Sequence, residues 1–161
     1  MVQEQRSEQQ AVSQIVVFQL ENEYYGADIS VVREVVPLQR VTRVPRTPPY
    51  VEGVINLRGR VIPVIDLRRR LGLPAGHTTK STRIAVAEVG GDQVGMIVDA
   101  VEEVVRVPAD AVEPPSSLMA QLDRDAVLGV AKVDSRLITL LDLRRILVRE
   151  DRKSPVTPHS R

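Results

Sequence analysis

Residues 53–71 of this chain occur a second time at residues 129–147, 76 positions further on, and nine of the 19 aligned positions are identical. Residues 15–36 align with residues 84–105 at a shift of 69, with seven identities. The shared order of these matches indicates an internal duplication into halves of about 70 residues. A unit of that size is marginal alone, so the halves are expected to pack together. The two shifts differ by seven, which predicts an insertion near residues 114–119.

Each half is predicted to be mainly β. Valine accounts for 28 of the 161 residues, and β-branched side chains favour strands. About five strands per half, ending in a hairpin, indicate a small barrel. In the first half we expect strands at residues 15–20, 24–29, 40–44, 53–57 and 60–65. The last two are joined by a turn at Arg58–Gly59, where glycine tolerates a positive φ.

Two short helices are also predicted in the first half. Residues 30–36 carry apolar pairs four positions apart, which fits one or two helical turns capped by Asp28 or Ser30. Residues 67–71 fit a single-turn helix whose N-cap is Asp66. The fold class expected is therefore two β-barrel subdomains with a few short helices.

The organisation expected is one domain over residues 14–150. Its first subdomain would span about residues 14–73 and its second about residues 82–150, with strand exchange between them left open. Residues 1–13 and 151–161 are polar and are expected to be disordered tails.

A cytoplasmic location is expected. No apolar run approaches the roughly 20 residues of a membrane helix, and the N-terminal residues lack the apolar core of a signal peptide. The chain contains no cysteine, which fits a reducing compartment.

Catalysis is not expected. The two histidines, His77 and His159, have no ordered serine or carboxylate near them in the sequence. Asp66 and Asp142 hold matching strand-to-helix positions, where a carboxylate caps a helix. A glycine-rich phosphate loop is missing. The prediction is a protein that is not an enzyme, with no catalytic residue, metal site or cofactor.

Nucleic-acid binding is a weaker alternative. A local basic cluster is formed by Arg58, Arg60, Arg68, Arg69 and Arg70. Small barrels that bind single strands stack bases on aromatic side chains, and this chain has one phenylalanine, three tyrosines and no tryptophan. The net charge of +1 offers no overall field to attract a polyanion.

Protein binding is the other possibility that the residues leave open. A helix of one or two turns is too short to bury all four of its valines, Val31, Val32, Val35 and Val36. They either seal a barrel end or present apolar surface to a partner. Arg58 at a hairpin tip is either solvated or a binding anchor.

The Asn-Leu-Arg-Gly run at residues 56–59, flanked by Gly-Val-Ile and Pro-Val-Ile-Asp-Leu, resembles the CheW family of chemotaxis coupling proteins. Further matches lie at residues 18–35, 94–101 and 129–143. The resemblance covers roughly residues 14–149, and the run around residues 56–59 is more specific than a single short motif.

The resemblance implies two five-stranded SH3-like β-barrels and a non-catalytic adaptor. Family members link the regulatory domain of the histidine kinase CheA to the cytoplasmic hairpin tips of transmembrane chemoreceptors, in arrays at the membrane. The receptor tip lies in an apolar groove between the barrels. Positions that match receptor-facing residues of the family are Val32 and Glu34 on the predicted helix, with Gly53, Asn56 and Arg58. The resemblance assigns no kinase-facing residue.

The chain departs from the family pattern in a more basic last helix, at residues 142–147, and in its C-terminal tail. Its length of 161 residues leaves no room for a kinase or receiver domain, so a stand-alone form is expected. An adaptor of a chemosensory pathway that controls surface motility or gene regulation fits equally well.

Overall fold

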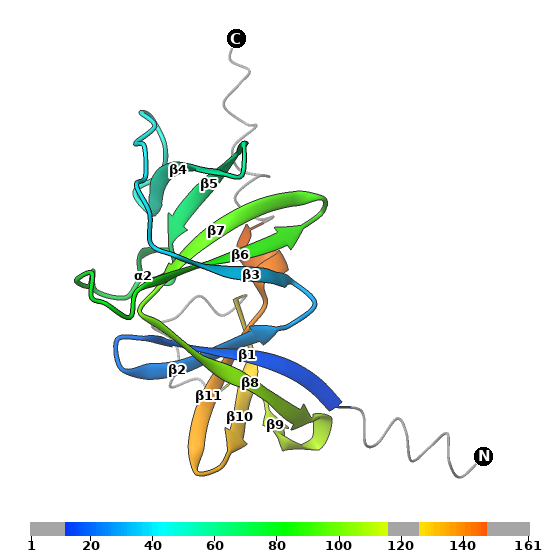
Figure 1. The fold of residues 1–161 in the computed structure, drawn as a ribbon. Helices are drawn as coiled ribbons and strands as arrows, with labels where there is room; N and C mark the ends of the chain where they lie inside the picture. Colours follow the sequence, from blue (N-terminus) through cyan, green and yellow to red (C-terminus); the bar gives the residue numbers. More distant parts are fainter. Residues whose placement is uncertain (1–11, 116–125, 148–161) are drawn as a thin grey trace.

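The protein consists of two twisted β-sheets, one above the other in Figure 1, and the computed structural model describes residues 12–115 and 126–147. In spatial order, the six-stranded sheet contains β8 (Ala100–Pro108), β1 (Val12–Leu20), β2 (Glu23–Asp28), β11 (Arg136–Leu141), β10 (Val127–Val133) and β9 (Val112–Glu113). The five-stranded sheet contains β3 (Val32–Pro37), β6 (Arg83–Val89), β7 (Asp92–Val98), β5 (Arg60–Asp66) and β4 (Val51–Leu57). The predicted mainly β fold is confirmed.

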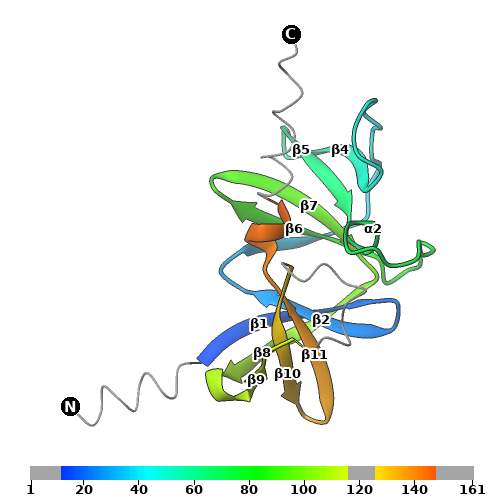
Figure 2. The same cartoon turned by 180° about the vertical axis from the view of Figure 1, so that it is seen from behind.

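Each sheet combines strands from both halves of the sequence. The hairpin β1–β2 of the first half pairs with β8 and β11, whereas the hairpin β6–β7 of the second half pairs with β3 and β5. Figure 2 shows the same arrangement from behind, with β1 and β2 beside β8, β10 and β11. The chain therefore passes from one sheet to the other twice, between β2 and β3 and between β7 and β8.

The strand register confirms the duplication. In one sheet Val64 of β5 lies opposite Gly95 of β7 in a parallel pair. In the other sheet Leu140 of β11 lies opposite Gly26 of β2. Val64 and Leu140 are related by the shift of 76, and Gly26 and Gly95 by the shift of 69. Both sheets are thus built on one pattern.

The predicted helix at residues 30–36 is wrong. This segment forms β3, which pairs antiparallel with β6 and has Val35 opposite Ala85. Val36 is buried and Val35 is 39% exposed, the alternation of a strand on the edge of a sheet. Asp28 caps no helix, and its carboxylate instead accepts a hydrogen bond from the Ser30 amide at 2.8 Å. β-branched side chains favour this extended form, and β6 supplies the partner for it.

The other local predictions have mixed outcomes. The strand expected at residues 40–44 is reduced to a single bridge between Thr42 and Val54. The hairpin turning at Arg58–Gly59 is confirmed, and so is the helix after Asp66, which forms α2 (Leu67–Arg70). The described strands form two open sheets rather than closed barrels. The tails expected at residues 1–13 and 151–161 lie outside the described residues, apart from the first two residues of β1.

One apolar cluster joins the two sheets. It contains Phe18 and Leu20 from β1 together with Met96 and Val98 from β7, all at most 1% exposed. Leu67 of α2 lies in the same cluster. Each sheet also has a smaller cluster of its own. A short 3-10 helix, η1 (Ala109–Ala111), connects β8 to β9. Within the described part of the chain, no helix has the length and apolar character needed to cross a bilayer.

Candidate functional site

Three of the predicted site residues, Glu34, Asn56 and Arg58, lie where the two edges of the five-stranded sheet approach one another. β3 and β4 stand at opposite ends of the strand order. Nevertheless Arg58, at the tip of the β4–β5 hairpin, forms an ion pair with Glu34 of β3 through its Nη2 atom. The sheet must therefore curl strongly, and the ion pair spans the opening between its edges.

The hairpin tip holds Arg58 in a fixed place. Arg58 has a φ of 52° and Gly59 a φ of 86°, so both turn residues are left-handed, as in a type I′ turn. The side-chain oxygen of Asn56 accepts a hydrogen bond from the Gly59 amide at 2.9 Å and braces the turn. The Arg58 side chain is 67% exposed, whereas that of Glu34 is 30% exposed. A guanidinium on a braced turn is available to a partner's carboxylate or carbonyl groups.

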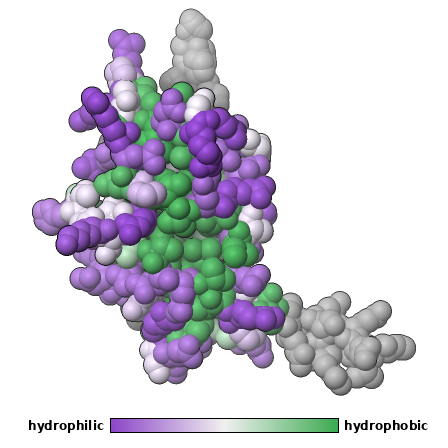
Figure 3. All heavy atoms as spheres, viewed as in Figure 1, coloured by the Kyte–Doolittle hydropathy of each residue, from purple (hydrophilic) through white to green (hydrophobic). Residues whose placement is uncertain are grey.

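Val32 lies two residues before Glu34 on β3. It is half-buried and packs against the cluster that joins the sheets. A bulge at Arg33 separates the two residues, and Arg33 forms its own ion pair with Glu88 at 3.0 Å. Figure 3 shows apolar side chains in a band that runs across this face from one sheet to the other. Among the exposed large apolar residues of the protein, Val35 lies on the edge strand β3 and Val104 on the edge strand β8.

Gly53 differs from the other four residues because it is buried. It has a φ of 147°, and a Cβ atom there would lie 2.0 Å from the carbonyl oxygen of Thr42. Gly53 follows a bulge at Glu52 in β4 and pairs with Val64, and its lack of a side chain lets Thr42 approach and form the bridge to Val54. The structure thus brings Glu34, Asn56 and Arg58 together and gives Gly53 a backbone role.

The predicted basic cluster is not one surface. Arg58 and Arg60 lie at the hairpin tip, whereas the other three arginines lie on α2 at the far end of β5 and contact the protein itself. Arg68 pairs with Asp99, Arg69 lies 3.6 Å from the carboxylate of Asp66, and Arg70 stands 5.7 Å from the ring centre of Tyr50. Nucleic-acid binding through this cluster therefore loses its structural basis.

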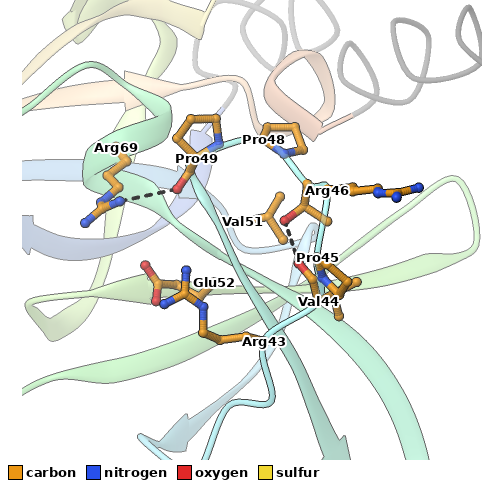
Figure 4. Close-up of a pocket in the computed structure, with 10 residues that line it drawn as sticks. Arg43, Val44, Pro45, Arg46, Pro48, Pro49, Val51, Glu52 and Arg69 are labelled. Atoms are coloured by element: carbon orange, nitrogen blue, oxygen red, sulfur yellow. Dashed lines mark hydrogen bonds between the residues drawn. The ribbon is translucent and has the colours of Figure 1, made fainter.

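A pocket of about 580 Å³ lies beside the proline-rich segment before β4. Figure 4 shows Arg69 donating a hydrogen bond to the carbonyl oxygen of Pro49, at 3.4 Å, while Arg46 points away from the other labelled side chains. The lining includes three arginines and one glutamate, Glu52, so its charge favours an anionic group. Among residues 12–115 and 126–147, no cluster of three or more His, Cys, Asp or Glu side chains is placed to hold a metal ion.

The two carboxylates considered for catalysis are helix caps, as predicted. The Asp66 side chain accepts a hydrogen bond from the Arg68 amide at 3.1 Å, and Asp142 accepts one from the Arg145 amide at 3.2 Å. Each therefore satisfies an amide at the start of a helix that would otherwise lack a partner.

Sequence reasoning missed the pairing of Arg68 with Asp99. Both side chains are largely buried, with 15% and 27% exposed. The hydrogen bond to Asp99 raises the pKa of Arg68 further above its already high ordinary value, so the guanidinium stays charged. The duplication contained a hint of this pair. Arg68 aligns with Arg144, an arginine in both halves, but Asp99 aligns with Ser30, so only one half has the carboxylate.

Comparisons with known proteins identify the family to which the chain belongs. Residues 14–151 match the model of the CheW-like domain. The chain is 36% identical over 143 residues to the chemotaxis protein CheW of Bacillus subtilis, covering 88% of this chain and 91% of that protein. It is 34% identical over 138 residues to the probable chemotaxis protein CheW of Rhizobium etli, covering 86% of this chain and 89% of that protein.

The scaffolding protein TtCheW from Thermoanaerobacter tengcongensis has a crystal structure similar to this fold. The TM-score is 0.77 with 42% sequence identity, over 83% of this chain and 91% of that chain. A family model that spans the two sheets, relatives above 30% identity and a shared fold lead to the same assignment. The chain belongs to the CheW family of chemotaxis proteins.

Proposed function

We propose that this protein is a non-catalytic cytoplasmic adaptor that couples transmembrane chemoreceptors to the histidine kinase CheA. The observation that carries the proposal is the ion pair between Arg58 and Glu34 at the opening of the curled sheet. It presents a charged pair beside apolar surface, and a rigid amphipathic helix hairpin such as a receptor tip matches both features. Membership of the CheW family supports the same role.

The five candidate residues have different parts in this proposal. Arg58 and Glu34 orient the receptor tip through charged hydrogen bonds, and Val32 supplies apolar contact. Asn56 braces the turn that carries Arg58, and Gly53 sets the path of β4. The regulatory domain of CheA would bind elsewhere on the molecule, on a surface that these residues do not define. Recruitment to receptor arrays at the membrane would follow from the two contacts together.

The test is binding of a purified receptor hairpin fragment to an Arg58→Glu variant. The new carboxylate faces Glu34, so the pair becomes repulsive and receptor affinity should fall by about tenfold or more. Stability should change little, because an exposed pair is worth about 0–1 kcal/mol. The matched control is Asp134→Arg, which alters the equivalent turn of the other sheet, where Asp134 has a φ of 51°. Equal receptor affinity for Arg58→Glu and the parent would refute the proposal.

A second measurement addresses the kinase. Sedimentation of the protein with the CheA regulatory domain should give a complex near 1:1, and Arg58→Glu should leave that complex intact. A protein that does not sediment with the kinase domain is not the proposed adaptor.

A further inference from the structure

Asp99 occupies the connection between β7 and β8, where the chain leaves the five-stranded sheet and enters the six-stranded one. Arg68, on α2, binds its carboxylate through two nitrogens. The Nε atom lies 3.1 Å from each carboxylate oxygen, and Nη2 forms a further hydrogen bond to Oδ2. A guanidinium that grips a carboxylate in this way fixes orientation as well as distance.

The pair also holds parts of both sheets. On the six-stranded side, Asp99 Oδ2 accepts a hydrogen bond from the amide of Glu21, at 2.8 Å, in the turn between β1 and β2. The Asp99 amide donates to the carbonyl oxygen of Gln19 at 3.0 Å. On the other side, Arg68 Nη1 donates to the carbonyl oxygen of Pro74 at 3.0 Å. One ion pair thus ties α2 and the chain after it to a turn of the opposite sheet.

Among the ion pairs between residues that the structure describes, this one is expected to be the strongest, because its two side chains together are the least exposed. Its side chains are 15% and 27% exposed, against 67% and 30% for Arg58 and Glu34. Water screens a partly buried pair less, and several hydrogen bonds satisfy the carboxylate of Asp99. Removal of Arg68 would leave that carboxylate without its charged partner.

The second crossing between the sheets has no such pair. The duplication places Ser30 at the position of Asp99 and Arg144 at that of Arg68. Ser30 has no carboxylate, and Arg144 is exposed and forms no ion pair with a residue that the structure describes. The β2–β3 connection is instead held by hydrogen bonds to Asp28, from the Val31 amide to its carbonyl oxygen at 3.0 Å and from the Ser30 amide to its carboxylate at 2.8 Å, and by burial of Val31 in the cluster that joins the sheets.

We propose that the Arg68–Asp99 pair is a latch that fixes the angle between the two sheets, and that Arg68 is thereby a positioning residue for partner binding. The second part rests on the proposed function, since a receptor tip that contacts both sheets needs them at one angle. The latch closes the β7–β8 crossing, whereas the β2–β3 crossing has no ion pair between residues that the structure describes. When the latch is broken, the sheets stay joined by their shared apolar cluster but sample a wider range of angles.

The angle can be measured with spin labels, because the chain has no cysteine of its own. Val61 and Leu137 occupy equivalent positions in the two sheets and are 67% and 63% exposed. Labels on Val61→Cys and Leu137→Cys should give one narrow distance distribution by pulsed electron paramagnetic resonance. Arg68→Ala should broaden or shift it, and Arg144→Ala, the matched control, should leave it unchanged. An Arg68→Ala distribution identical to the parent's would overturn the latch.

A charge swap and a conservative variant keep the test informative if Arg68→Ala folds poorly. Arg68→Lys keeps the charge but loses the two-nitrogen grip, so a broader distribution is expected with an intact circular dichroism spectrum. Arg68→Asp combined with Asp99→Arg should narrow the distribution relative to either single change. The Glu21 amide should exchange its hydrogen faster in Arg68→Lys than in the parent, and unchanged exchange there contradicts the latch.

Receptor binding separates this inference from the proposed function. If one molecule in ten keeps the parent angle, the affinity of Arg68→Lys for a receptor hairpin should fall about tenfold. A changed distance distribution with unchanged affinity would keep the latch and refute its role in binding. If Arg58→Glu binds receptor normally, the proposed function fails, and the distance measurements still decide whether the latch exists.

Discussion

At the scale of single residues, the surroundings of Gly53 leave no room for a side chain. An added Cβ would stand 2.0 Å from the carbonyl oxygen of Thr42, and the φ of 147° is strained for any other residue. Gly53→Ala should lower the free energy of unfolding by about 2–4 kcal/mol. Gly59 is the control, since its added Cβ meets open space, and Gly59→Ala should cost about 1 kcal/mol. Urea unfolding monitored by circular dichroism gives both values; equal losses would contradict this account.

Ionisation of Tyr25 is expected to lower the stability of the protein at alkaline pH. Burial, followed by the charges of Glu23 and Glu21, raises the pKa of Tyr25 above its ordinary value of 10.0. The unfolded chain therefore ionises this tyrosine first as pH rises, so the associated stability is complete below about pH 10 and is lost above it. Unfolding free energies measured from pH 8 to 11 should fall less steeply for Tyr25→Phe than for the parent. If the unfolding free energies of Tyr25→Phe and the parent fall equally steeply with pH, Tyr25 is not the cause of the loss.

At the scale of elements, the two hairpins that end in Arg58–Gly59 and Asp134–Ser135 are natural controls for one another. Both turns have left-handed residues, and Ser135 adopts a φ of 68° where the first turn has glycine. Ser135→Gly should stabilise the protein by about 0.5–1 kcal/mol, because glycine takes this conformation without strain. Gly59→Ser should destabilise it by a similar amount. Thermal unfolding decides the point: a lower melting temperature for Ser135→Gly would contradict the turn argument.

Elements whose signals are local were predictable from the sequence. The turn at Gly59, the caps at Asp66 and Asp142, and the duplication depend on residues close together or on repeated patterns. β3 was mistaken for a helix because Val31 and Val35, like Val32 and Val36, are four apart. Tertiary pairing with β6 overrides that pattern, and no local feature announces it.

Residues that act through distant contacts were harder to predict. The resemblance to the CheW family named Glu34 and Arg58, but only the curled sheet explains why they meet, 24 residues apart and on opposite edges. Asp99 carried no local signal beyond being a carboxylate. Its partner Arg68 became apparent only when the fold brought the β7–β8 connection to α2.

At the scale of the whole molecule, the net charge of +1 conceals a separation of charge. Residues 32–98, which form the five-stranded sheet and α2, contain 11 Lys and Arg against five Asp and Glu. Residues 12–31, 99–115 and 126–147, which form the other sheet, contain five against ten. The expectation that the chain has no overall field was based on the net charge alone and not on where the charges lie in the fold. The fold gives a basic end that carries Arg58 and an acidic end, which can orient a charged partner before contact.

The exchanged hairpins explain why the halves depend on one another. In isolation, the first half could use its own β1–β2 hairpin in place of β6–β7, since the copies match in register. That substitution would put Phe18 at the place of Ala87, which is fully buried. An aromatic ring in the space of a methyl group overpacks a core and costs several times the usual strain of one added methylene. Sequence divergence thus keeps the β1–β2 hairpin from replacing β6–β7 in its own half.

Fragments 14–73 and 82–150 should therefore fail to fold separately and should fold when mixed. In each fragment alone, four strands lack one of their pairing partners, and about half of the cluster that joins the sheets is missing. Circular dichroism and size-exclusion chromatography of each fragment should show an expanded chain without a cooperative transition, and an equimolar mixture should recover a compact complex with one transition. Phe18→Ala in fragment 14–73 is the control, since it removes the clash and should allow some self-closure. Cooperative unfolding of the unaltered fragment 14–73 alone would show that strand exchange does not make the halves interdependent.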